Sequence, residues 1–264
     1  MRPLTDQEYE EARSRSPRSL DICPTCEGTY KLNREAGVKA WESKGYRYRG
    51  EHHDCDCKTQ MALYRRYLLA NIGDQYMRLN WDDYEGPQEV NEAVASYIEN
   101  WKDFLAHGFG LTFSSQNLGV GKTFASATIG KALIKKGQKV YFQDFVQMID
   151  AFLSDDRSHI ESKMKEATFL IIDDVMSGKS EKQTDLYGLK FEVVIRHRTN
   201  FNLPTIFTTN MTEDQFEKAF ERIYSLTAPK QMWIAMNGND YRKDVSVAEE
   251  TALMIRNGER RPIV

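Results

Sequence analysis

The sequence predicts an α/β fold built on a parallel sheet and preceded by a small cysteine-rich module. From about residue 90, helix-like and strand-like segments alternate along the chain, which is the pattern of a parallel α/β sheet. A Gly-Lys-Thr tripeptide stands between a predicted strand and a predicted helix, and all four cysteines lie within the first 80 residues. We therefore predict two units, residues 1–80 and residues 81–264.

The individual elements follow from the spacing of apolar residues. Helical spacing predicts helices over residues 58–69, 89–107, 122–136, 145–153, 186–199, 214–224 and 247–256. Short apolar runs predict five strands, over residues 111–113, 139–142, 169–172, 205–208 and 231–236. The run 169–172 is almost unbroken, as expected of a strand that is covered on both faces.

Composition narrows the class of protein. The 264 residues are 41% hydrophobic and 28% charged, which is ordinary for a globular domain. The net charge of -3 argues against a protein that coats duplex DNA by bulk charge. Basic clusters such as the run 196–198 are expected to be solvated surface. No apolar run is long enough for a membrane helix, and the polar N-terminus does not read as a signal peptide, so we expect a cytoplasmic protein.

The window 116–123 is predicted to bind the phosphates of a nucleotide. It matches the phosphate-loop pattern G-x-x-x-x-G-K-[ST] except at its first position, and it reads Gln116, Asn117, Leu118, Gly119, Val120, Gly121, Lys122, Thr123. Glycines let successive N–H groups point at phosphate oxygens at the start of a helix. Lys122 would reach the β- and γ-phosphates, and the Thr123 hydroxyl would ligate magnesium. We therefore expect ATP and Mg²⁺ as ligands.

A second site is predicted where the strand at 169–172 ends in Asp173 and Asp174. Ligands bind at the carboxyl ends of strands in parallel sheets. Asp173 would hold magnesium, and Asp174 would orient the attacking water. The alternative is an acidic turn after a strand. Asn210 follows the next predicted strand, at 205–208, where it would contact the γ-phosphate or the water, or simply cap the following segment.

The cysteines form two pairs, Cys23 with Cys26 and Cys55 with Cys57. Zinc prefers four tetrahedral ligands of this kind, and Cys-x-x-Cys wraps one ion with two thiolates. A redox Cys-x-x-Cys would sit in a βαβ fold, which this region does not predict. We expect structural Zn²⁺ on all four cysteines, with His52 or His53 as a possible replacement for one thiolate. Metal binding would supply folding free energy that this polar segment lacks.

Taken together, several segments resemble the DnaC/DnaI-type AAA+ helicase loaders, whose branch includes the IstB-type transposition ATPases. The resemblance rests on residues 119–123, 170–174, 203–210 and 238–242. It implies an AAA+ P-loop ATPase core with a five-stranded parallel sheet over residues 81–264. It also implies that Arg242, in the Gly-Asn-Asp-Tyr-Arg segment, is similar to a sensor 2 arginine.

The resemblance further implies subunits that assemble side by side, with an arginine of the neighbour completing each ATP site. The arginine that this family carries in a Ser-Arg-Leu-like segment has no counterpart in residues 222–227. Arg222, or Arg196 on the preceding helix, is the candidate replacement. Zinc modules occur at the N-terminus of DnaI-type and phage-like loaders, so residues 1–80 are expected to dock on a replicative DnaB-type helicase, with single-stranded DNA as a further partner.

Three functions remain open from the sequence. The first is an ATP-dependent loader of a hexameric replicative helicase onto single-stranded DNA during replication initiation. The second is an IstB-like transposition ATPase, and the N-terminal zinc module favours the loader over it. The third is a nucleotide-sensing adaptor with little hydrolysis, since Gln116 replaces a glycine and the family's arginine is missing.

Overall fold

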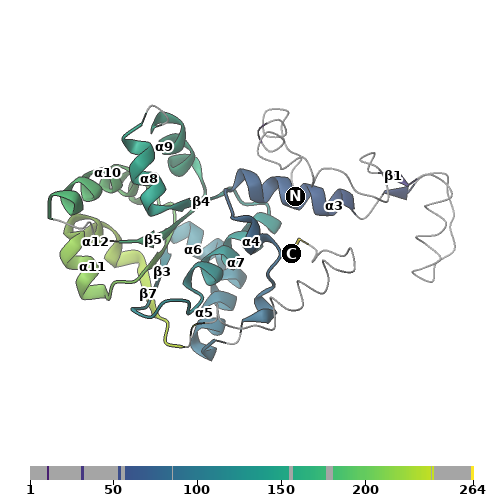
Figure 1. The fold of residues 1–264 in the computed structure, drawn as a ribbon, viewed down its shortest axis with the longest axis horizontal. Helices are drawn as coiled ribbons and strands as arrows, with labels where there is room; N and C mark the ends of the chain where they lie inside the picture. The colour runs from purple at the N-terminus through teal and green to yellow at the C-terminus, as the bar shows by residue number, and fades with distance from the viewer. Residues whose placement is uncertain are drawn as a thin grey trace.

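The computed structural model of the protein describes residues 57–84, 86–154, 157–176, 181–238, 240 and 263–264, together with residue 11 and the short segments 31–32 and 53–54. Its centre is a five-stranded sheet of β3 (Gly110–Ser114), β4 (Val140–Asp144), β5 (Phe169–Val175), β6 (Thr205–Thr209) and β7 (Gln231–Ala235). The strand order is β4-β5-β6-β3-β7, and every neighbouring pair is parallel (Figure 1). The predicted five-stranded parallel sheet is confirmed.

Helices cover both faces of the sheet (Figure 1). One face carries α3 (Cys57–Leu69), α4 (Asp74–Met77), α5 (Gln88–Glu99), α6 (Trp101–His107) and α7 (Lys122–Lys135). The other face carries α8 (Phe145–Phe152), α9 (Arg157–Glu166), α10 (Glu181–Asn200), α11 (Glu213–Ala219) and α12 (Glu221–Thr227). Two short 3-10 turns, η2 (Trp81–Asp83) and η3 (Ala228–Lys230), complete this part of the chain. The described core is therefore a three-layer α/β/α fold.

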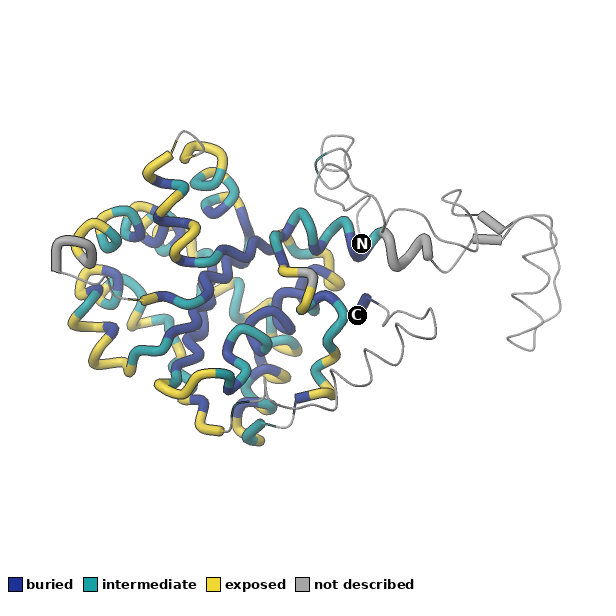
Figure 2. The backbone as a smooth tube through the Cα atoms, viewed as in Figure 1, coloured by how far each residue is buried: buried dark blue, intermediate teal, exposed yellow. Residues whose placement is uncertain are grey.

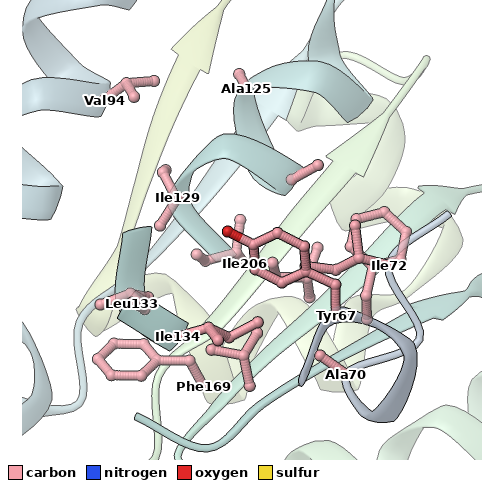
Figure 3. Packing of buried hydrophobic residues seen from close by; sticks show 14 of the residues in the cluster. Tyr67, Ala70, Ile72, Val94, Ala125, Ile129, Leu133, Ile134, Phe169 and Ile206 are labelled. Carbon is pink, nitrogen blue, oxygen red and sulfur yellow. The ribbon is translucent and has the colours of Figure 1, made fainter. Parts of the chain in front are cut away.

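The two-residue period of a strand distributes the side chains of β5 between two apolar cores. Phe169 and Ile171 face the core around α7, whereas Leu170 and Ile172 face the core around α8 and α10. Figure 3 shows Phe169 beside Leu133 and Ile134 of α7, and the deeply buried chain in Figure 2 follows the sheet. Burial on both faces explains why this strand reads as a continuous apolar run.

Two predicted helices are each divided in the structure. The helix predicted over 89–107 is interrupted at Asn100, whose backbone leaves the helical region (φ -96°, ψ 22°) and whose side-chain amide donates to Ser96 O at 3.0 Å. Asparagine favours such local bonds over the helix ladder. The helix predicted over 214–224 divides at Phe220 (φ -135°, ψ 49°). Both breaks depend on one residue's dihedral angles, which apolar periodicity does not register.

Other expectations fare differently. Helix α9 has few buried residues and was not predicted, and the helix predicted over 247–256 lies outside the described residues.

The expectation that the basic run 196–198 is solvated surface is wrong for Arg198, which is 1% exposed. Five hydrogen bonds hold its guanidinium among backbone and hydroxyl oxygens between α9, β5 and β6. No helix in the described part of the chain is long and apolar enough to cross a membrane.

The end of the chain packs against α3. Ile263 is 6% exposed and belongs to the apolar core that also contains Tyr67 and Met77. The Val264 amide donates to Met77 O at 3.1 Å, and the Tyr67 hydroxyl donates to Val264 O at 2.9 Å. These contacts fasten residues 263–264 to the layer of helices that also contains α7.

Candidate nucleotide site

The phosphate-loop window lies between β3 and α7, at the carboxyl edge of the sheet. Gly119 and Gly121 have φ angles of 76° and 90°, a left-handed conformation that residues with a Cβ rarely adopt. Gln116 is not among the described residues with positive φ, so its position does not require glycine. The departure from the motif at Gln116 therefore leaves the turn of the loop intact.

Lys122, the first residue of α7, is 8% exposed and folds back on the loop. Its ammonium donates to Ser115 O at 3.2 Å and to Asn117 O at 3.1 Å. The Asn117 amide in turn donates to the Ser115 hydroxyl at 3.1 Å. The only lysine of the window thus contacts the backbone of the loop that is predicted to bind the phosphates.

Asp173 lies within β5 and contacts two hydroxyl groups from other elements. Thr123 donates to its Oδ2 at 3.1 Å, and Thr208 of β6 donates to its Oδ1 at 2.6 Å. The carboxyl group is buried, and this burial raises its pKa to about 6. The alternative of a solvated acidic turn does not fit a strand residue with 9% exposure. A hydroxyl and a buried carboxylate so close together are suited to ligating Mg²⁺.

Asp174 is turned out of the regular strand. Its φ of 54° coincides with a register shift between β5 and β6 near Ile172 and Val175. Its amide donates to the Thr208 hydroxyl at 2.8 Å, and its Oδ1 accepts from the Asn210 side chain at 2.9 Å. The two neighbouring acids therefore point differently, one toward Thr123 and the other toward Asn210.

Asn210 does not act as a helix cap, because Thr212 caps α11. Its Oδ1 is buried and has no hydrogen-bond partner within the described part of the chain. A buried acceptor without a partner is costly unless a ligand or water completes it. The Asn210 Oδ1 beside Asp174 is therefore suited to accept a hydrogen bond from a further polar group, such as a water molecule.

Sequence reasoning missed Thr208, which contacts both acids, and an aromatic cluster on the other side of the loop. Trp81 and Tyr84 stack with ring centroids 4.4 Å apart, and both rings pack near Phe124 of α7. A Cβ on Gly121 would lie 2.8 Å from the Tyr84 ring, so this glycine is also required for packing. Trp81 and Tyr84 stand in a polar stretch without periodicity, which gave no signal for this role.

The two candidate arginines share one acid on the face formed by α10 and α12. Arg222 is 74% exposed in its side chain and lies 3.6 Å from Glu192 Oε2. Arg196 pairs with the other oxygen of the same carboxylate. The hydrogen bond from Arg196 is the main reason that the pKa of Glu192 is lowered. The two candidate arginines, Arg196 and Arg222, therefore both lie beside the Glu192 carboxylate. Arg242 lies outside the described residues.

The predicted zinc site lies almost entirely outside the described residues. Cys23, Cys26 and Cys55 are not described, nor are the side chains of Cys57, at the start of α3, and His53. No group of three or more potential metal ligands occurs elsewhere in the described ranges. The zinc site therefore remains a prediction.

Comparison with known proteins shows which proteins the chain resembles. No protein-family model matches the chain. The chain is 30% identical over 137 residues to the replicative helicase loader DnaI of Bacillus subtilis (strain 168), an alignment that covers 50% of this chain and 42% of that protein. It thus spans less than half of the relative's length.

Solved structures agree on the fold. A crystal structure of the DnaC helicase loader aligns with a TM-score of 0.54 and 22% identity, over 62% of this chain and 100% of that one. The predicted resemblance to the DnaC/DnaI-type helicase loaders is confirmed. A crystal structure of DnaI also aligns, with a TM-score of 0.50 and 22% identity over 63% of this chain and 95% of that one. The described core has the P-loop ATPase fold.

Proposed function

We propose that the protein is an ATPase that loads a replicative hexameric helicase of the DnaB type onto single-stranded DNA during replication initiation. The proposal that the protein hydrolyses ATP is supported by one observation: three groups of residues lie together at one edge of the sheet. The phosphate loop, the Asp173–Thr123 pair and the Asp174–Asn210 pair are joined there through hydrogen bonds. The loader part is supported by the similarity to DnaI over half of the chain.

The roles of the residues follow from their positions. Residues 116–123 bind the phosphates, with Lys122 supplying the cation. Thr123 and Asp173 would hold Mg²⁺, which when bound would supply positive charge to the phosphates. Asp174 accepts a hydrogen bond from the attacking water, and the Asn210 Oδ1, which lacks a protein partner among the described residues, accepts a second. Thr208 is a positioning residue, because its hydroxyl contacts both acids.

Hydrolysis is completed by a neighbouring copy in a homo-oligomer. Charge on the transferring phosphoryl group needs a cation, which an arginine supplies in many such ATPases. Arg222 has the exposed side chain that this role requires, and Arg196 is the second candidate; Arg242 would act from within the same subunit. Residues 1–80 would form the zinc-binding module that docks on the helicase, joined to the ATPase domain of residues 81–264.

Measurement of the rate of ATP hydrolysis tests whether the protein is an ATPase. It also distinguishes an ATPase from an adaptor that binds ATP without useful hydrolysis. Lys122→Ala is expected to weaken nucleotide binding at least about tenfold, and Asp174→Asn to retain binding but lose turnover by about a hundredfold or more. Lys139→Ala and Asp150→Asn, at exposed positions on the same domain, are matched controls. A wild-type protein that shows no turnover with single-stranded DNA and helicase present would support the adaptor.

Mixing subunits tests the shared site. Arg222→Ala and Lys122→Ala proteins should each be inactive, whereas a mixture should regain part of the turnover, because mixed junctions combine an intact loop with an intact arginine. Arg196→Ala, measured in the same assay, tests whether Arg196 supplies the arginine instead of Arg222. Normal turnover in both arginine variants would contradict the assignment.

Loading itself is measured with a purified DnaB-type helicase and circular single-stranded DNA. The loader predicts that helicase bound to the circle increases with this protein and ATP, and that Asp174→Asn alters the yield. An IstB-like ATPase would leave helicase loading unchanged and would instead bind a transposase.

A further inference from the structure

We propose that residues 76–84, here called the brace, hold the phosphate loop in its anion-binding conformation, and that Lys131 of α7 is the positioning residue that fastens this segment. This role rests on the proposed nucleotide binding and deepens it, since it belongs to residues outside the loop and the acid pairs. Both ends of the brace contact α7 or the loop before this helix. Helix α4, which contains the first two residues of the brace, packs beside α7 (Figure 1).

One end of the brace lies against the last residues of the loop. Tyr84 is 7% exposed, and its hydroxyl donates to Val120 O at 3.5 Å. Its ring fills the space beside Gly121, where an added Cβ would lie 2.8 Å from a ring atom. Trp81 stacks on this ring with an interplanar angle of 16°, and its centroid lies 5.3 Å from that of Phe124 in the first turn of α7. The two stacked rings therefore pack against the junction between the loop and α7.

The other end of the brace is fastened by a buried side chain. Lys131 is 4% exposed, and its ammonium donates to Tyr76 O at 2.9 Å and to Leu79 O. The first carbonyl lies in α4, and the second directly precedes Asn80, the N-cap residue of the turn η2. An ammonium has three donors, so one side chain holds two carbonyls of the brace at once. Lys131 follows Gly121 by ten residues, which places the two attachments about 15 Å apart along α7.

The loop gains from such support because its turn depends on glycines. Gly119 and Gly121 have φ angles of 76° and 90°, and glycine reaches many other conformations at little cost. A nucleotide that had to order a free loop would lose binding free energy to the lost backbone entropy. Contacts from the brace restrict the loop before the nucleotide binds, and a binding site that is ordered in advance avoids that loss. The brace thereby raises the affinity for phosphates without touching the nucleotide.

The ionisation of Lys131 gives this support a dependence on pH. Burial is the main cause that lowers the pKa of the ammonium to about 8; the charge of Lys135 on α7 adds to the effect, and Asp83 of η2 opposes it. A neutral amine holds carbonyls less strongly, because charge-assisted hydrogen bonds are the stronger ones. The affinity for phosphates should therefore fall as pH rises through about 8. Arginine stays charged over this range, so Lys131→Arg should lose the dependence.

The test compares the affinities of full-length proteins for ATP and for inorganic tripolyphosphate, each with magnesium, by displacement of a fluorescent ATP analogue. Tripolyphosphate offers phosphates to the loop but carries no base. We expect Lys131→Met and Tyr84→Leu each to weaken the binding of both ligands by a similar factor, about tenfold. Lys131→Arg should stay within about threefold of wild type at neutral pH. Lys136→Met, at an exposed lysine that ends the same helix, is the matched control.

Several results would overturn the proposal. Variants that bind ATP more weakly but tripolyphosphate normally would mean that the brace acts on the base rather than on the loop. Unchanged affinity for both ligands, or a wild type that binds ATP but not tripolyphosphate, would mean that the brace does not set the affinity of the loop for phosphates. A wild-type affinity that does not change across the pKa of about 8 would exclude Lys131 as the fastening residue.

Circular dichroism at the assay temperature checks that each variant is folded. If Lys131→Met does not fold, Tyr84→Leu and the pH profiles of wild type and Lys131→Arg still decide the outcome. If the wild type binds neither ATP nor tripolyphosphate, the proposed function fails instead, and the two failures are thereby distinguished.

Discussion

At the scale of single residues, the candidate site depends on a hydroxyl group, that of Thr208, to which the sequence analysis assigned no role. Thr208 donates to Asp173 at 2.6 Å and accepts from the amide of Asp174 at 2.8 Å. One threonine therefore fixes the directions of two consecutive acids. Burial raises the pKa of Asp173, the proposed magnesium ligand, to about 6, because a desolvated carboxylate is less stable when charged.

The raised pKa of Asp173 makes a prediction about stability against pH. A carboxyl group whose pKa is higher in the folded protein binds its proton more tightly there, so folding gains stability as pH falls through the folded pKa toward the unfolded one. Relative to the ordinary value of 3.8, a folded pKa of about 6 corresponds to a cost of about 3 kcal/mol at neutral pH.

Asp173→Asn is therefore expected to be about 1–3 kcal/mol more stable than wild type above pH 7. The difference should shrink as pH falls below about 6 and should vanish near pH 4, as the folded and unfolded pKa values require. Urea denaturation without nucleotide across this range measures it, with Asp150→Asn on exposed α8 surface as the control. A pH-independent difference would contradict the explanation.

At the scale of elements, Arg198 shows how a helix end is joined to the sheet. Its guanidinium donates to Met164 O at 2.7 Å and Ala167 O at 2.8 Å on one side, and to Pro204 O at 2.6 Å on the other. These carbonyls end α9 and precede β6. One side chain of α10 thus satisfies backbone acceptors that two connections would otherwise leave buried and unpaired.

Arg198→Met should therefore destabilise the fold by about 3–5 kcal/mol, since several carbonyls lose their donor together. Arg196→Met, two residues away and exposed, should change stability by about 0.5 kcal/mol or less. Denaturation followed by tryptophan fluorescence compares the two. Similar effects for both variants would mean that the buried hydrogen bonds add little.

At the scale of the whole molecule, segments far apart in sequence meet on α3 and α9. Residues 263–264 pack against α3, and Lys163 of α9 forms an ion pair with Glu11. A groove of about 520 Å³ lies between α3, β4, α8 and α9, with Tyr141 and Ile160 in its lining. Helix α3, which lies within the predicted module of residues 1–80, is thus packed into the core of the described fold and contacts residues 263–264.

The packing of Ile263 predicts a measurable contribution to stability. Ile263→Ala should cost about 2–3 kcal/mol, because a buried branched side chain is removed from an apolar core. Tyr67→Phe should cost about 1 kcal/mol through the lost hydrogen bond to Val264 O. Val146→Ala, at a side chain that is 44% exposed, is the control. Thermal or urea denaturation that finds no loss for Ile263→Ala would contradict the packing.

The zinc module makes a prediction at the same scale. We expect one zinc ion per chain by elemental analysis, and greater sensitivity to proteolysis around the two cysteine pairs when the metal is chelated. Cys23→Ser and Cys26→Ser should lower the zinc content, whereas mutation of His107, a histidine of α6, should leave it unchanged. A metal-free protein whose N-terminal region resists proteolysis as well as the zinc-loaded form would exclude the site.

The sequence by itself determined the five strands of the parallel sheet, the position of the loop between a strand and a helix, and most of the helices. Apolar runs and helical stripes of adequate length are local signals, and all five strands were identified from them. Fixed spacing and strand position predicted the loop and the acids at residues 173 and 174 as candidate site residues, and the structure brings Thr123 of the loop into contact with Asp173. The helix breaks at Asn100 and Phe220 were not predicted, because a single residue's dihedral angles leave the apolar pattern almost unchanged.

Tertiary structure alone decided which residues complete the site. Thr208 is 35 residues from Asp173, and Tyr84 is 36 residues from Val120, so sheet order and chain path bring each pair together. The burial of Arg198 within a basic run, and the contact of Arg222 with Glu192 of another helix, are likewise invisible in the sequence. Local composition sets what each segment can form, whereas burial and long-range contact set what each side chain can do.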